Sequence, residues 1–255
     1  MSEPVTAAKC GALLDALRVK KPLVHFITNY VTVNDCANIT LAVGGAPVMS
    51  DQPDDAAEIC RLASALVFNI GTPGDRTLEA MLRAGKAANE AGIPVVLDPV
   101  GAGASSFRNR LLEKLLEEVK FAAVKGNISE IRFLASGTGK SMGVDASKDD
   151  IALGSDSSAV ARLAAGLSRG IGAVVIVSGR IDVAADGERA YGISNGDAMM
   201  GRLTGTGCMG SGVVASFLGA APGEPLASSI AGMCVMGLAG ELARKKLAPS
   251  SGTGT

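Results

Sequence analysis

The chain has 255 residues, of which 47% are apolar, and it can therefore bury the core of one large domain without disulfides or structural metals. Lys and Arg number 24 against 25 Asp and Glu, a balance that argues against a nucleic-acid partner or a cationic membrane-binding face. The five cysteines are widely spaced and include no C-x-x-C pair, which favours a reducing, cytoplasmic location.

Short β-rich runs alternate with helical stretches along the chain, at residues 22–28, 46–50, 65–71, 93–99, 121–127 and 173–179. This alternation predicts a mostly parallel sheet covered by helices on both faces. Residues 181–193 instead carry two β-like arms around Asp186 and Gly187, a pair typical of hairpins. We therefore expect an α/β fold of three α/β/α layers, with antiparallel strands at the edge of the sheet and one domain over residues 1–255.

Three other segments have distinct compositions. Residues 136–150 are polar and rich in glycine and are predicted to form a mobile loop or an interrupted helix. The apolar stretch 226–242 is interrupted by glycines and Glu241, and we interpret it as a buried helix. Residues 249–255 are predicted to form a flexible tail, and the N-terminal residues contain no apolar region typical of a signal peptide.

Polar residues and glycines follow nearly every predicted strand. In open α/β sheets, ligands bind beyond the carboxyl ends of the strands, so these positions are the first candidates for chemistry. Each residue alone is equally explained as a turn former, and only their convergence favours a site. The strand-end positions are Thr28, Asn29, Asn69, Gly71, Asp98, Lys125, Gly126, Asn127, Ser178 and Gly179.

The sharpest local feature is the sequence Gly205-Thr206-Gly207-Cys208 before a stretch of small and apolar residues. Glycines at the start of a helix let several backbone N–H groups face one anion, and the transferring phosphate is one candidate. Residues 205–210 also match G-x-G-x-x-G, but a strand does not precede them as dinucleotide binding requires. Cys208 would be favoured as a thiolate at this position, and the alternative is an inert, packed cysteine.

Asn127 and Glu130 are three residues apart at a predicted helix start. They would point toward the same phosphate region, where a carboxylate holds Mg²⁺ through water. A plain helix-capping pair is the competing interpretation. Asp98 is open to the same two interpretations, as a metal ligand or as a turn residue. His25 lies within a strand and is interpreted as structural, and Gly139-Lys140-Ser141 is only a partial match to a phosphate-binding loop.

Taken together, these segments resemble the hydroxyethylthiazole kinase family of the ribokinase-like superfamily. The resemblance covers residues 22–240 and rests on ordered segments that include VHFITNYVTVNDCAN, LAVGGAPVMS, LVFNIGT, VVLDPVGAGA, AAVKGNISEI and LTGTGC. It implies transfer of the γ-phosphate of ATP, with Mg²⁺, to the hydroxyl of 4-methyl-5-(2-hydroxyethyl)thiazole in thiamine salvage. It also implies a homotrimer with sites at the subunit interfaces.

The resemblance assigns roles to residues of this chain. It places Met49 and Gly205 in the thiazole pocket, with Asn29 nearby, and Cys208 at the position of the catalytic base. It places Lys125 and Ser178 on the ATP phosphates, beside the predicted contributions of Asn127, Thr206 and Gly207. It places Asp98 and Glu130 where the family holds magnesium or its waters.

Two positions depart from the pattern common in the family, because Lys125 replaces an arginine and Ser178 a threonine. Lysine keeps the charge but lacks the planar fork that binds a phosphate through two hydrogen bonds. The alternatives on the same scaffold are a kinase for hydroxymethylpyrimidine or pyridoxal, a dehydratase for hydrated nicotinamide nucleotides, and a binding protein without activity. The cysteine after Gly205-Thr206-Gly207 weighs against the dehydratase.

Overall fold

Eight strands form one sheet in the order β2-β1-β3-β4-β5-β6-β7-β8 in the computed structural model, which describes residues 4–136 and 156–247. The strands β1 to β6 are parallel, and β7 and β8 run antiparallel at one edge. Their bounds are β1 Leu23–Ile27, β2 Ala46–Met49, β3 Ala65–Asn69, β4 Val95–Asp98, β5 Ala123–Asn127, β6 Val174–Ser178, β7 Asp182–Ala185 and β8 Ala190–Ile193. The predicted parallel sheet and the predicted hairpin are both confirmed.

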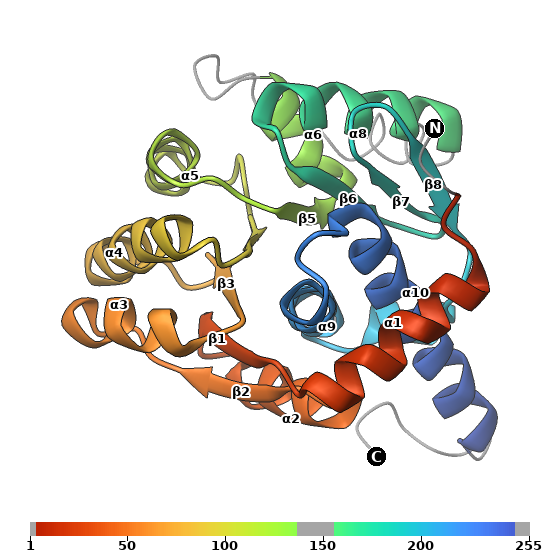
Figure 1. The fold of residues 1–255 in the computed structure, drawn as a ribbon. Coiled ribbons are helices and arrows are strands. Elements are labelled where there is room, and N and C mark those ends of the chain that lie inside the picture. Colours follow the sequence, from red (N-terminus) through yellow and green to blue (C-terminus); the bar gives the residue numbers. More distant parts are fainter. Residues whose placement is uncertain (1–3, 137–155, 248–255) are drawn as a thin grey trace.

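Helices cover both faces of the sheet and complete three layers (Figure 1). One face carries α3 Pro53–Leu62, α4 Asp75–Ala91, α5 Ser106–Glu118, α6 Ile128–Ser136 and α8 Ser157–Ile171. The other carries α1 Ala7–Lys20, α2 Val33–Val43, α9 Thr206–Ala220 and α10 Pro225–Lys246. A short 3₁₀ helix, η1 Ala198–Arg202, precedes α9.

The strands contribute alternate side chains to two separate cores. In β3, Leu66 and Phe68 pack on the side of α3 and α4, while Ala65 and Val67 pack on the side of α9. Every residue of β3 is buried, as expected for a central strand of a parallel sheet with helices on both faces. The unbroken apolar runs in the sequence follow from this double burial.

The predicted helix over residues 226–242 forms the first part of α10 and packs against α9. A Cβ at Gly232 would lie 3.0 Å from the backbone of Val214, so the two helices meet at close range. Among the described helices, α10 alone is long and apolar enough to cross a membrane by length and composition. Of its most apolar 18-residue stretch, 44% is buried inside the protein. Its buried residues include Ile230 and Met233, so packing in the core accounts for much of its apolar character.

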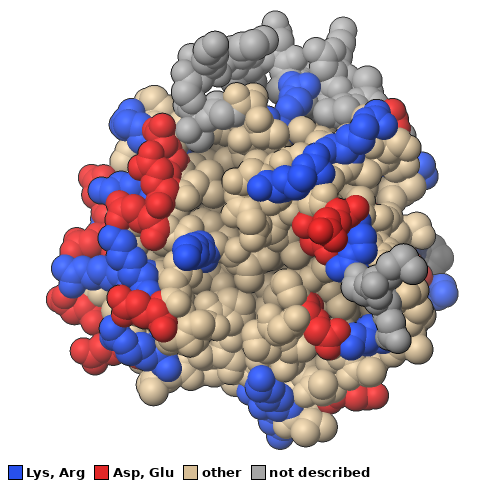
Figure 2. Space-filling view, turned by 45° about the horizontal axis from the view of Figure 1, so that its top comes forward, with Lys and Arg blue, Asp and Glu red and all other residues tan. Residues whose placement is uncertain are grey.

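The charged side chains in view alternate in sign along one side of the molecule (Figure 2). That side corresponds to the helices α3, α4 and α5, where Arg83 pairs with Asp54 at 2.7 Å and with Glu79 at 2.6 Å. These are exposed pairs of small energetic value. On the face that Figure 2 shows, charges of one sign do not gather into a broad patch.

Several predicted segments fall outside the part of the chain that the structure describes. Ser136 ends α6, and the remainder of the predicted loop 136–150 lies outside it, together with Gly139-Lys140-Ser141. The predicted tail 249–255 also lies outside the described residues.

Candidate active site

The carboxyl ends of the parallel strands bring the predicted polar residues to one edge of the sheet. Asn69 lies in register with Asp98 on the neighbouring strand, and Asn127 with Ser178 on the next pair. Helix α9 begins at the same edge, because Cys208 in its first turn contacts both Asn29 and Asn69. The residues predicted from separate strand ends therefore do converge.

Cys208 lies in the first turn of α9, where the backbone turns sharply. The residue before the helix, Gly205, has a φ of 89°, a left-handed conformation that favours glycine. Glycine has no side chain that could cap the helix, and no side chain binds the first N–H groups of α9. These N–H groups are therefore available to an anion. The sulfur of Cys208 lies 3.2 Å from Nδ2 of Asn69 and 3.5 Å from Nδ2 of Asn29.

Asn29 and Gly205 are joined through Thr32. The backbone N–H of Thr32 donates to Oδ1 of Asn29 at 3.0 Å, and a Cβ at Gly205 would lie 2.7 Å from Cγ2 of Thr32. Asn29 and Gly205 therefore line the same corner beside Cys208. Met49 is the last residue of β2, the outermost strand of the sheet, and it pairs with Phe26 of β1. It therefore lies at the carboxyl end of its strand, as the other candidate residues do.

His25 supports the residues that follow Met49. Its Nε2 donates to the backbone carbonyl of Ser50 at 2.8 Å, and the ring is fully buried in β1. Burial lowers the pKa of His25, against smaller raising effects of the Ser50 bond and Asp55. The neutral ring therefore acts as a support for this turn, in agreement with its interpretation as structural.

A cavity of about 490 Å³ adjoins the start of α9. The ammonium of Lys125 donates to the backbone carbonyl of Gly207 at 2.9 Å, and the hydroxyl of Ser178 donates to Gly126 at 3.2 Å. The hydroxyl of Thr206 donates to the backbone carbonyl of Met200 at 3.2 Å. The lining includes four of the five residues assigned to ATP, which are Lys125, Ser178, Thr206 and Gly207, together with Asp182, Asn195, Asp197, Met233 and Met236.

Asp98 lies beneath this edge rather than on its surface, with 4% of its area exposed. Its Oδ2 accepts from Ser211 at 2.8 Å and from Asn69 at 2.8 Å. Burial raises the pKa of the Asp98 carboxyl, and Lys125 together with the two hydrogen bonds opposes that rise. The carboxyl is thus held inside a network of side chains.

Glu130 and Asn127 form a reciprocal capping box at the start of α6. Oε2 of Glu130 accepts from the backbone N–H of Asn127 at 2.8 Å, and Oδ1 of Asn127 accepts from the N–H of Glu130 at 2.9 Å. This is the capping arrangement that the sequence left open. Oε1 of Glu130 also accepts from the N–H of Gly101 at 2.9 Å, which joins the loop after Asp98 to α6. Burial raises the pKa of Glu130.

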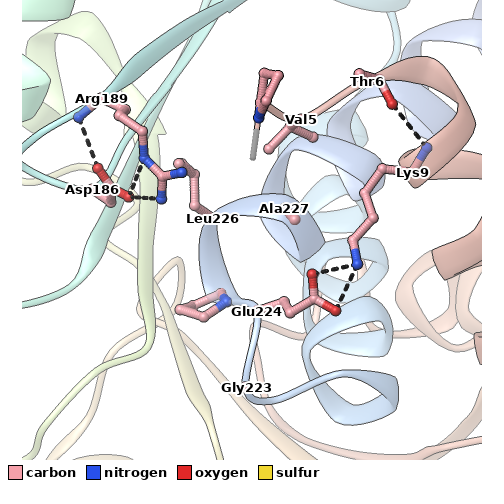
Figure 3. Close-up of a pocket in the computed structure, with 11 residues that line it drawn as sticks. Val5, Thr6, Lys9, Asp186, Arg189, Gly223, Glu224, Leu226 and Ala227 are labelled. Atoms are coloured by element: carbon pink, nitrogen blue, oxygen red, sulfur yellow. Dashed lines mark hydrogen bonds and ion pairs between the residues drawn. The ribbon is translucent and has the colours of Figure 1, made fainter. Parts of the chain in front are cut away.

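A second cavity, of about 660 Å³, lies beside the start of α10 (Figure 3). It is larger, but its lining comes from the β7–β8 turn, the N-terminal segment and the start of α10. Its charged side chains pair with one another, Lys9 with Glu224 and Arg189 with Asp186 (Figure 3). Because it contains no carboxyl-end residue of a parallel strand, we assign the chemistry to the smaller cavity.

Two residues of the network were not anticipated from the sequence. Ser211 lies three residues after Cys208 on α9, a spacing that places both on the same side of a helix. Thr32 follows Asn29 by three residues and donates to it, as turn residues often do. Both spacings are visible in the sequence, but a spacing alone does not show which residue Ser211 or Thr32 binds.

The family model named "Hydroxyethylthiazole kinase family" matches residues 14–254. A curated hydroxyethylthiazole kinase of Clostridium beijerinckii is 47% identical over 247 residues, covering 97% of this chain and 88% of the relative. The structure of a hydroxyethylthiazole kinase protein from Pyrococcus horikoshii superposes with a TM-score of 0.84 at 35% identity, covering 96% of this chain and 88% of that one.

An ADP/ATP-dependent NAD(P)H-hydrate dehydratase of Bacillus subtilis superposes with a TM-score of 0.58 at 10% identity. The match covers 98% of this chain and 88% of the dehydratase. At this identity the likeness shows a shared ribokinase-like fold alone. The expected fold class is therefore confirmed. The fold alone does not distinguish a thiazole kinase from a dehydratase, whereas the sequence identities do.

Proposed function

The chain belongs to the hydroxyethylthiazole kinase family, and we propose that it transfers the γ-phosphate of ATP to the hydroxyl of 4-methyl-5-(2-hydroxyethyl)thiazole. The product would be the thiazole phosphate used in thiamine salvage. One observation supports this most directly. The first turn of α9 carries the Cys208 sulfur beside Asn29, and its Gly207 carbonyl lies 2.9 Å from the Lys125 ammonium in the lining of the 490 Å³ cavity.

We assign the thiazole to the corner formed by Asn29 and Gly205, with Met49 closing it from the edge strand. Gly205 has a φ of 89° and closely approaches Thr32, so a side chain there would fill this corner. Cys208 borders the corner, which places a sulfur beside the hydroxyl of a bound alcohol.

We assign ATP to the cavity lined by Lys125, Ser178, Thr206 and Gly207. The uncapped N–H groups of α9 and the ammonium of Lys125 would face the phosphates, where both stabilise negative charge. Asn127 lies at the end of β5 as the cap of α6, so its contribution would be to shape the phosphate end of the cavity.

In the proposed reaction, the thiazole hydroxyl oxygen attacks the γ-phosphorus while its proton passes to the thiolate of Cys208. The O–P bond to ADP breaks, and ADP leaves. Positioning and electrostatic stabilisation would supply most of the rate in such transfers. Proton transfer to Cys208 would add about 10²–10⁴-fold, the range usual for a general base.

The residues at this edge fit a magnesium ion that is held mainly by ATP. Within residues 4–136 and 156–247, no three His, Cys, Asp or Glu side chains gather as a metal cage. Magnesium in kinases typically uses one or two carboxylates with phosphates and waters. Glu130 would hold the magnesium ion through a water molecule. Asp98, which is buried beneath this edge, would attract the ion by its charge. When bound, the ion would neutralise charge on the phosphates.

We also propose a homotrimer with the active sites at its interfaces. Large apolar side chains are exposed, with Tyr30 at 80%, Val31 at 60% and Leu242 at 49%. Tyr30 and Val31 directly follow Asn29, and a Cβ at Gly205 would lie 2.7 Å from Cγ2 of Thr32, so these two residues adjoin the proposed thiazole corner. The mass in solution should equal three chains of 25.6 kDa, and Val31→Asp should shift it toward the monomer.

Five free cysteines and a need for ATP support a cytoplasmic location for the chain. The eight strands between residues 23 and 193 form a single sheet, which supports treating residues 1–255 as one domain.

The direct test offers the purified protein Mg-ATP with hydroxyethylthiazole, hydroxymethylpyrimidine or pyridoxal, and detects each phosphorylated product by mass. We expect thiazole phosphate as the main product. Phosphorylation of another alcohol in preference to the thiazole would reassign the substrate. ATP-dependent dehydration of a nicotinamide nucleotide, with no alcohol phosphorylated, would contradict the proposed kinase activity.

A further inference from the structure

Asn69 bridges the two chemical parts of the site. Its Nδ2 lies 2.8 Å from Oδ2 of Asp98 and 3.2 Å from Sγ of Cys208. Its exposed area is 3%. The side chain stands between a buried carboxylate and the sulfur that would accept the substrate proton.

The orientation of this amide follows from the backbone. The N–H of Gly71 lies 2.9 Å from Oδ1 of Asn69, and a backbone N–H can only donate, so the atom that faces it must be the carbonyl oxygen. The NH₂ group therefore points toward Asp98 and Cys208. Its two hydrogens match two acceptors, the carboxylate and the sulfur.

Asn29 is oriented by the same logic. Its Oδ1 accepts from the backbone N–H of Thr32 at 3.0 Å, so its NH₂ group faces the site. That group lies 2.8 Å from Oδ1 of Asn69 and 3.5 Å from Sγ of Cys208. Two anchored amides thus present N–H groups to one sulfur, and the sulfur is the acceptor in both contacts.

Asp98 completes the support of the Asn69 side chain. Its Oδ2 receives the hydroxyl of Ser211, which lies one turn beyond Cys208 on α9, in addition to the amide of Asn69. The amide cannot turn away from Cys208 without losing its bonds to Asp98 and Gly71. The strands β3 and β4 are thereby coupled to the first turn of α9.

We propose that Asn69 is the positioning residue that holds the Cys208 sulfur as a hydrogen-bond acceptor, directed at the substrate hydroxyl. This role rests on the proposed kinase function. In the transfer step Cys208 takes part as the thiolate, so the hydroxyl O–H bond breaks and an S–H bond forms at its sulfur. The oxygen forms its bond to the γ-phosphorus as the bond to ADP breaks. Asn69 exchanges no proton and acts only through the sulfur.

Other charged or titratable groups also act near this sulfur. Asp98 and Lys125 lie at the adjoining strand ends, and their charges act on one another. Asp35 and Cys36 approach from α2, and burial raises the pKa of Cys36 to about 12, so Cys36 is a neutral thiol. The test must therefore change the Asn69 amide and leave these four residues in place.

The test compares Asn69→Ala and Asn69→Leu with the parent protein. Asn69→Leu nearly keeps the volume of the side chain, adds no charge and removes the NH₂ group that faces Asp98 and Cys208. Asn89→Ala is the matched control, because Asn89 also makes two hydrogen bonds, both to the backbone of Lys120, at the end of α4. Thermal unfolding identifies the variants that fold, and Asn69→Leu is used if Asn69→Ala does not fold.

The first readout is the rate of iodoacetamide reaction at Cys208 against pH, followed by peptide-resolved mass spectrometry. Loss of the donated hydrogen bonds should slow that reaction near neutral pH, because these bonds favour the charged form of the sulfur. The second is the steady-state rate, where kcat should fall about 10- to 100-fold while KM for ATP changes less than about twofold. Asn89→Ala should change neither.

A folded Asn69 variant with the parent alkylation profile and parent kcat would overturn the assignment. So would equal effects of Asn69→Ala and Asn89→Ala. The alkylation readout needs no kinase activity. If the parent protein phosphorylates none of the alcohols, the proposed function fails, while the alkylation profiles still decide whether Asn69 holds the sulfur.

Discussion

The ammonium of Lys125 donates to the backbone carbonyl of Gly207 at 2.9 Å, which ties the end of β5 to the first turn of α9. The side chain is 2% exposed, and its stem lies against Gly210, where a Cβ would come within 3.0 Å of Cε. A buried ammonium is tolerated only with compensating partners. Here the carbonyl of Gly207 and the nearby charge of Asp98 supply them, and bound phosphates would add to them.

Lys125→Met should impair the use of ATP, because it keeps the unbranched stem and removes the charge. We expect kcat/KM for ATP to fall about 10²–10³-fold, the usual effect of losing one preorganised donor. Lys86→Met is the control, since Lys86 pairs with Glu118 on the surface, and it should retain the parent value. Initial rates at varied ATP provide the measurement. Unchanged kinetics in Lys125→Met would remove Lys125 from the ATP site.

Gly205→Ala should damage both stability and activity. A residue with a side chain at positive φ costs about 1–2 kcal/mol, and here the added Cβ would also lie 2.7 Å from Cγ2 of Thr32. Gly172→Ala is a matched control, because Gly172 has a φ of 68° with no atom within 4 Å of an added Cβ.

Both glycine variants should lose free energy of unfolding in urea, and Gly205→Ala should lose more. Only Gly205→Ala should also lose phosphoryl transfer, since the contact with Thr32 adjoins Asn29 and Cys208. Equal stability losses and full activity in both would show that the approach of Gly205 to Thr32 is of no consequence.

Cys208→Ala should lower kcat about 10²–10⁴-fold at saturating substrates if the sulfur takes the hydroxyl proton. Cys60→Ala tests whether the loss is specific, because Cys60 is fully buried in α3, on the other face of the sheet. It should lose some stability to the smaller side chain and keep its turnover. Full turnover in Cys208→Ala, measured by mass of the phosphorylated product, would reject the base assignment.

His25 should make the protein less stable in mild acid. Burial lowers the pKa of His25 from an ordinary value of 6.5. Below about pH 6.5, His25 is therefore protonated in the unfolded chain while it is still neutral in the folded protein. The free energy of unfolding should therefore hold above about pH 6.5 and fall as the pH drops below it, by at most about 1.4 kcal/mol per pH unit. The loss should level off once the pH is below the folded pKa of His25.

His25→Gln provides the comparison, because glutamine does not titrate and keeps a donor for the carbonyl of Ser50. Urea unfolding from pH 8 to pH 5 should show a shallower decline in this variant than in the parent. The carboxylates titrate in both proteins, so the difference between the two curves reports on His25. Parallel curves would mean that the buried ring accepts a proton without cost.

Local patterns in the sequence were sufficient to predict the architecture. The apolar runs of β3 and β4 are unbroken because both faces of each strand are buried, and this is the signature of a parallel sheet. Asp186 and Gly187 predicted the β7–β8 hairpin, in which Asp186 accepts from the N–H groups of Glu188 and Arg189 and Gly187 has a φ of 90°. Turn chemistry of this kind depends on neighbours in the chain and is visible without a structure.

The same patterns also predicted which positions meet at the site, because strands of one direction end at one edge. Asn29, Asn69, Asp98 and Lys125 each follow an apolar run, and the structure brings them together there. The resemblance of the ordered segments to the hydroxyethylthiazole kinase family supplied the chemistry, and the family is confirmed.

Only the tertiary structure decided which atoms face each other. The carboxylate of Glu130 makes the capping box, an alternative that the sequence left open, and Asn69 presents its NH₂ group to Cys208, 139 residues away in the chain. Lys125 and Gly207 are 82 residues apart. The packing of α9 against the sheet fixes such contacts, and that packing sums many small contributions that no short stretch of sequence contains.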